Sequence, residues 1–137
     1  MTPSLLDLDR LSDLGRLIGQ ARLTSLCDQL KQGLEAVLNE AEAELTSALA
    51  APGPRSDLAT RAHQLRGSSA SLGLNALAQA LARLEAALSG EPPAPSQIRT
   101  ALIAARRCGD ETWRVLAAEA RSHERNRVKI TPLGDSH

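Results

Sequence analysis

The spacing of apolar residues is the feature that most constrains how this chain can fold. In the longest regular stretch, from about Gln20 to Ala50, leucines and alanines recur at alternating three- and four-residue steps. The apolar positions are Leu23, Leu26, Leu30, Leu34, Val37, Ala41, Leu45 and Ala48. This spacing puts the side chains on one face of an α-helix, because a helix has 3.6 residues per turn. Such a helix would be roughly 42 to 45 Å long, enough to form the spine of a helical bundle.

Four shorter segments show the same pattern and are separated by residues that break helices. We expect these helices at about 4–17, 55–72, 75–89 and 96–120. Proline-rich runs at 51–54 and 91–95 interrupt the pattern, since proline lacks a backbone donor and restricts the chain. We expect Gly73 to end the third helix in the left-handed conformation, and Asn75 and Ser96 to cap the two helices that follow.

These segments predict an all-α fold, an antiparallel four-helix bundle with an additional short N-terminal helix across one end. Composition agrees with this class. Leu, Ala, Ile and Val make up almost all of the 42% apolar share, and the chain has one Trp and no Phe or Tyr. Gly109 could mark a kink in the last helix. We assign residues 1–120 to the bundle and interpret 121–137, which are polar and basic, as a mobile C-terminal tail.

Charge and cysteine content argue against several classes of function. Sixteen basic and sixteen acidic residues give a formal net charge of zero, so no field of one sign favours a nucleic-acid or membrane partner. No stretch approaches the ~20 apolar residues of a membrane span, and the N-terminus lacks a secretory leader pattern. Cys27 and Cys108 are far apart and form no metal-binding or redox motif. We therefore expect a soluble, cytoplasmic protein with two packed thiols.

One helix carries a histidine on the face opposite its apolar stripe. The stripe consists of Leu58, Ala62, Leu65, Ser69 and Leu72. His63 lies roughly 160 to 200° from Leu65 and Leu72, and Arg66 and Gly67 follow on the face of His63. Imidazole can act as a nucleophile near pH 7, arginine supplies a permanent positive charge, and glycine leaves room for a second molecule. The pattern indicates a reactive surface histidine.

The same residues resemble a known family. The run His63-Gln64-Leu65-Arg66-Gly67-Ser68-Ser69, followed by Leu72-Gly73, Leu77, Leu81 and Leu84-Glu85, resembles the histidine phosphotransfer (HPt) domain of two-component phosphorelays. The resemblance covers roughly residues 5 to 120. It implies that His63 accepts a phosphoryl group from an aspartyl phosphate on a receiver domain and passes it to another receiver aspartate. The implied partners are response-regulator receiver domains and a hybrid or sensor histidine kinase.

The resemblance also implies roles for the neighbours of His63. Arg66 would stabilise the charge of the phosphoryl group, and Gly67 would provide steric clearance. Glu85 stands where the family has its ring-orienting residue, often Gln. A carboxylate there would accept from Nδ1–H and leave Nε2 free as the nucleophile. The alternatives are a solvated Arg66, a weak point in the helix at Gly67, and a surface ion pair between Glu85 and Arg83 or Arg66.

Further residues are candidates for contact with a partner. Gln64 and Ala70 lie on the exposed side of the third predicted helix. Leu8 and Leu11 of the first could extend an apolar docking patch, although both could equally belong to the core. We expect Ser69 to pack tightly and to donate a hydrogen bond back to the preceding turn.

The sequence contains no motif for a reaction other than phosphoryl transfer. The ATP-binding motifs of P-loop proteins and protein kinases are missing, so we expect a carrier rather than an enzyme, with no metal or cofactor. Mg²⁺ would come from the receiver domain during transfer.

Two other functions stay open. One is a helical interaction module that regulates a receiver or sensor kinase by docking, without being phosphorylated. The other is an adaptor that binds nucleic acid through the basic residues after Arg121.

Overall fold

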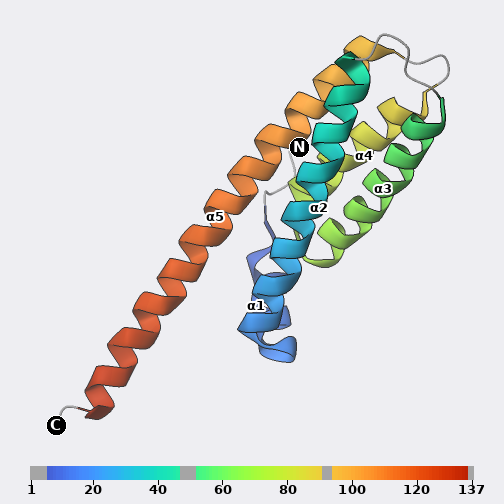
Figure 1. Ribbon diagram of the computed structural model, residues 1–137. Helices are drawn as coiled ribbons and strands as arrows, with labels where there is room; N and C mark the ends of the chain where they lie inside the picture. Colours follow the sequence, from blue (N-terminus) through green and yellow to red (C-terminus); the bar gives the residue numbers. More distant parts are fainter. Residues whose placement is uncertain (1–5, 47–51, 91–93, 136–137) are drawn as a thin grey trace.

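The computed structural model describes the backbone of residues 6–46, 52–90 and 94–135 and the side chains of 6–45, 57–90 and 94–121. Within these residues the chain forms five helices and no strand. They are α1 (Leu8–Ile18), α2 (Gln20–Thr46), α3 (Pro52–Ser71), α4 (Asn75–Ser89) and α5 (Pro95–Asp135) (Figure 1). The predicted all-α class is confirmed.

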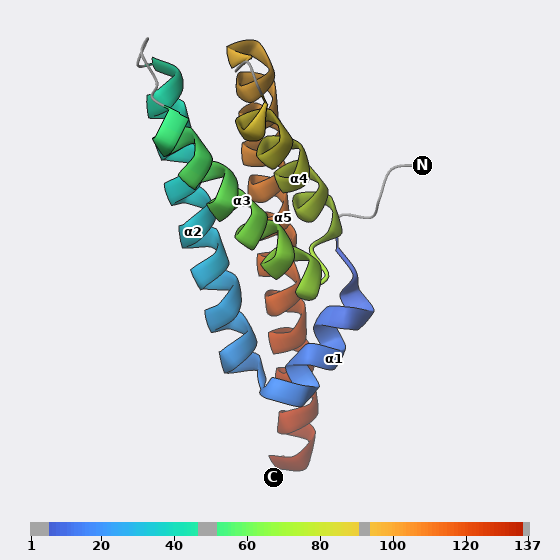
Figure 2. The same cartoon turned by 90° about the vertical axis from the view of Figure 1, so that its right-hand side faces the viewer.

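The four long helices surround one core. α2 packs against both α3 and α5, and α4 packs against the same two helices. Followed by colour in Figure 1, α2 and α4 run in the opposite direction to α3 and α5. α1 contacts α2 and lies at the end of the bundle where α3 turns into α4 (Figure 2). This arrangement leaves the outer faces of α3 and α4 free of other described helices.

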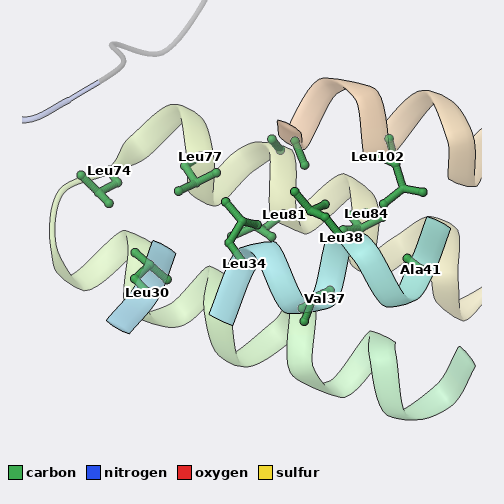
Figure 3. Packing of buried hydrophobic residues seen from close by; sticks show 14 of the residues in the cluster. Leu30, Leu34, Val37, Leu38, Ala41, Leu74, Leu77, Leu81, Leu84 and Leu102 are labelled. Carbon is green, nitrogen blue, oxygen red and sulfur yellow. The ribbon is translucent and has the colours of Figure 1, made fainter. Parts of the chain in front are cut away.

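Leucines from α2 and α4 form the centre of the core (Figure 3). Leu34 and Leu38 on α2 are each 2% exposed, and Leu77, Leu81 and Leu84 on α4 are fully buried. Burying one such side chain stabilises a fold by about 1.5 to 3 kcal/mol. Leu34 belongs to the predicted apolar face of α2, whereas Leu38 does not, and Leu26, which was predicted on that face, is 37% exposed.

The starts of α1 and α3 and the caps of α4 and α5 differ from the sequence prediction, and α1 begins at Leu8 rather than near residue 4. α3 begins at Pro52, a few residues early, so Pro52 and Pro54 both lie in its first turn. Proline is tolerated there because the first four backbone N–H groups of a helix have no partner within it. α4 begins at Asn75, and its N-cap is Leu74, which makes no side-chain capping bond. Ser96 likewise lies inside α5 rather than capping it.

The last helix is longer than the sequence predicted. α5 runs without interruption through Gly109 and on to Asp135, so the segment 121–137 is helical as far as the structure describes it. Its mobility stays a prediction. A Cβ atom at the buried Gly109 would lie 3.0 Å from Leu34 Cδ2 on α2. Glycine at this position therefore allows α2 and α5 to approach each other closely.

The turn between α3 and α4 is fastened to the start of α1. Gly73 ends α3 with a φ of +81°, as predicted. Its carbonyl accepts the backbone N–H of Asp7 at 2.8 Å, and Arg10 Nε donates to the carbonyl of Ser71 at 3.0 Å. Asp7 also caps α1, because its Oδ1 accepts the backbone N–H of Arg10. α1 thus supports the C-terminal end of the helix that carries His63.

Candidate functional site

His63 lies on the outer face of α3, as the helical pattern predicted. Its side chain is 58% exposed. Leu58, Ala62 and Leu72 on the opposite face are at most 8% exposed. The imidazole is therefore accessible from solvent. Its place on a helix fixes the position of its backbone.

Three polar side chains meet at this point. Nδ1 of His63 lies 3.0 Å from Oε2 of Glu85, a residue of α4 that is 22 positions away in the sequence. Arg66, one turn further along α3, places Nη2 2.9 Å from the same Nδ1. Its Nε lies 3.2 Å from Oε1 of Glu85. We call His63, Arg66 and Glu85 the His63 triangle.

The contact with Glu85 favours one tautomer of the ring. A carboxylate only accepts hydrogen bonds, so Nδ1 must carry a proton when it bonds to Glu85. In that tautomer the lone pair is on Nε2, and no described residue makes a hydrogen bond to Nε2. A neutral imidazole held in this way is a nucleophile at Nε2.

Arg66 lies beside Nδ1 rather than beside Nε2. Its Nε is buried and makes no hydrogen bond, so its 3.2 Å contact with Glu85 is an ion pair without hydrogen-bond geometry. Glu85 therefore forms an ion pair with Arg66, which the sequence analysis gave as an alternative, and also contacts His63. To reach a phosphoryl group on Nε2, the guanidinium would have to leave Nδ1 and turn around the ring.

Gly67 faces open space on the same side of α3. A Cβ atom at this position would meet no heavy atom within 4 Å. At Gly33 on α2, by contrast, it would lie 3.1 Å from Leu65 Cδ2. Packing inside the described chain thus gives no reason for glycine at position 67, although glycine costs about 1 kcal/mol relative to alanine within a helix. The open space is what the approach of a second molecule requires.

The predicted docking residues divide into exposed and buried ones. Gln64 and Ala70 are exposed on α3, and Leu8 on α1 is 47% exposed. Leu11 is only 8% exposed and belongs to the buried core. The prediction of Leu11 as part of an exposed patch is therefore wrong, because the packing of α1 on α2 turns this side chain inward.

Two features near the site were not predicted from the sequence. The hydroxyl of Ser69 is fully buried and has no hydrogen-bond partner, so the expected bond to the preceding turn does not form. The second is the contact of Arg66 with Nδ1. The three-residue spacing of His63 and Arg66 puts them on one face, which was the available signal. It does not say which ring nitrogen the arginine reaches.

One groove lies away from the His63 triangle. It has a volume of about 310 Å³ and lies between α1, α2 and α5, where Leu8, Cys27 and Trp113 are among its lining residues. Burial raises the pKa of Cys27, and the nearby Asp28 adds to this.

In the part of the chain that the structure describes, no group of three or more potential ligands could hold a metal ion. No helix there is long and apolar enough to cross a membrane.

Comparison with known proteins adds one finding. A family model described as Hpt domain matches residues 25–118, which include the whole His63 triangle. The match leaves out α1, the first five residues of α2 and the end of α5. The search of curated proteins found no match, and neither did the search of solved structures.

Proposed function

The chain belongs to the Hpt domain family, and we propose on this basis that His63 is the residue that carries the phosphoryl group. Hpt domains are histidine phosphotransfer carriers of phosphorelays rather than kinases, and they work with phosphorelay kinases and receiver domains. In our proposal, His63 accepts the group from an aspartyl phosphate of one receiver and passes it to the aspartate of another.

The proposed step needs no proton to leave the ring. The lone pair of Nε2 attacks phosphorus, an N–P bond forms, and the P–O bond to the aspartate breaks with release of its carboxylate. Because Nδ1 keeps its proton, the phosphorylated ring is a cation, which the carboxylate of Glu85 stabilises by accepting from Nδ1–H. Transfer to the second receiver reverses these steps, with its aspartate as the attacking group.

One observation carries the proposal. His63 is exposed, Nδ1 is in contact with the carboxylate of Glu85, and Nε2 has no hydrogen-bond partner among the described residues. The open space at Gly67 supports the approach of a receiver domain. Arg66 brings a positive charge that can turn toward phosphoryl oxygens.

Several finer statements belong to the same proposal. The receiver would supply Mg²⁺ during transfer, and this chain would need no ATP site or cofactor of its own. The alternating directions of α2 to α5 support an antiparallel four-helix bundle. The unpaired thiols of Cys27 and Cys108 support a cytoplasmic location, because disulfides are rare in that reducing compartment.

The test follows label from a receiver domain phosphorylated on its aspartate, in the presence of Mg²⁺. We expect acid-labile label on the wild-type chain and none on His63→Gln. The matched control is a His123→Gln/His137→Gln variant, which removes the other two histidines of the chain and should be labelled normally. Absence of label on the wild type, or undiminished label on His63→Gln, would contradict the proposal. An unlabelled chain that still binds the receiver would indicate the docking module instead.

A further inference from the structure

Nδ1 of His63 has two polar neighbours that require opposite protonation states of this nitrogen. Glu85 Oε2, at 3.0 Å, can only accept, so this hydrogen bond requires a proton on Nδ1. Arg66 Nη2, at 2.9 Å, can only donate, so that hydrogen bond requires a lone pair on Nδ1. A neutral ring offers one or the other. Glu85 and Arg66 therefore favour opposite tautomers of the same imidazole.

The two tautomers differ in reactivity at the other nitrogen. With the proton on Nδ1, the lone pair on Nε2 can attack phosphorus. With the proton on Nε2, that nitrogen has no lone pair in the plane of the ring and cannot attack. The contact with Arg66 therefore opposes the form of His63 that phosphoryl transfer uses.

We propose that Arg66 is a positioning residue that holds part of the unphosphorylated protein in the unreactive tautomer and releases the ring when a phosphoryl group approaches. This inference rests on the function proposed above. It assigns Arg66 a restraining role in the free protein, in addition to charge stabilisation during transfer.

The ion pair between Arg66 and Glu85 explains why the arginine stays beside Nδ1. Glu85 attracts the guanidinium through Oε1 and competes with it for the ring through Oε2. An approaching phosphoryl group carries more negative charge than one carboxylate and offers several acceptor oxygens to an arginine. When Arg66 turns toward it, Nδ1 becomes available to Glu85. The ring proton then moves from Nε2 to Nδ1 through water, and the number of protons on the ring does not change.

The test measures the tautomer directly by ¹⁵N NMR of the histidine side chains in the full chain. At pH about 9, where an imidazole is neutral, the ¹⁵N shifts separate protonated from unprotonated ring nitrogens. In Arg66→Met, which keeps the aliphatic stem but has no donor, we expect the ratio of the Nδ1–H to the Nε2–H form to rise by about tenfold, equivalent to ~1.4 kcal/mol. In Glu85→Leu, which removes the acceptor, the ratio should fall.

A matched control separates the hydrogen bond from the loss of charge. Arg83 is exposed on α4 and lines a groove between α4 and α5 that no residue of the His63 triangle lines. Arg83→Met removes the same charge and should leave the tautomer ratio of His63 unchanged. An Arg66→Met ratio within about twofold of the wild type, or one shifted toward Nε2–H, would overturn the inference.

Failure of the inference and failure of the proposed function give different results. If His63 takes up label and Arg66→Met leaves the tautomer ratio unchanged, the restraining role is refuted and the carrier function stands. If the ratio shifts as expected but no label reaches His63, the competition for Nδ1 is supported and the carrier function is refuted. Helical circular dichroism of each variant verifies that it is folded, and Arg66→Leu, which also has no donor, provides an independent reading if Arg66→Met does not fold.

Discussion

Replacing Gly67 by alanine should make the protein more stable and less active. Alanine is favoured over glycine by about 1 kcal/mol inside a helix, and the added Cβ atom would meet nothing within 4 Å. For a chain of this size, that gain corresponds to a rise in Tm of about 3 to 6 °C. The same methyl group would project one turn from His63 into the space that a receiver must enter. We expect transfer to slow by about tenfold in Gly67→Ala and by about 100-fold in Gly67→Gln.

Two measurements on the same samples test this prediction. Guanidinium denaturation gives the free energy of unfolding, and the initial rate of label uptake from a phosphorylated receiver gives the transfer rate. Gly33→Ala is the matched control, because Gly33 also lies within a helix but its Cβ atom would press against Leu65 Cδ2 at 3.1 Å. It should gain little stability and transfer normally. If Gly67→Gln transfers the phosphoryl group at the wild-type rate, a side chain at position 67 does not obstruct the receiver. If Gly67→Ala lowers the free energy of unfolding, the space around this residue is not open.

Three further predictions concern the fold. Gly73→Ala should lower the free energy of unfolding by about 1 to 2 kcal/mol, because φ is +81° there and the new Cβ atom would lie 3.2 Å from Asp7 Cβ; an unchanged denaturation midpoint would contradict this. Leu81→Ala, which empties a fully buried position, should cost about 2 to 5 kcal/mol in the same assay, and a loss below about 1 kcal/mol would place Leu81 outside the core. Burial raises the pKa of both Cys27 and Cys108, so as pH rises the unfolded chain loses these protons first, and stability should fall between about pH 8 and 10. A Cys27→Ala/Cys108→Ala variant should lose less stability over that range, whereas an identical pH dependence would exclude the thiols as its cause.

The period of the apolar residues explains why much of the fold could be predicted. One face of each helix must be buried, so the spacing alone put His63 on the outside of α3. The positive φ of Gly73 followed from its place after the last apolar residue of that helix. The meeting of His63 with Glu85 was different, because spacing does not set the register between two helices. The family resemblance supplied it, through the position that Glu85 shares with the family's ring-orienting residue.

The features that the sequence did not predict depend on contacts between helices. Leu8 and Leu11 are three residues apart and lie on one side of α1, and only the packing on α2 decides that Leu11 is buried. Arg66 has several rotatable bonds, and the carboxylate of Glu85 on the neighbouring helix determines where its guanidinium lies. The extension of α5 beyond Arg121 runs through polar residues without a regular apolar stripe, so periodicity gave no signal for it.

The most direct test of the central claim locates the phosphoryl group on the ring. A chain with ¹⁵N-labelled histidines, phosphorylated by a receiver and kept at alkaline pH, can be examined for coupling between phosphorus and a ring nitrogen. We predict coupling to Nε2 of His63 and a proton on Nδ1. Coupling to Nδ1, or a phosphoryl group on any other residue, would contradict the claim that Glu85 holds one nitrogen so that the other can react.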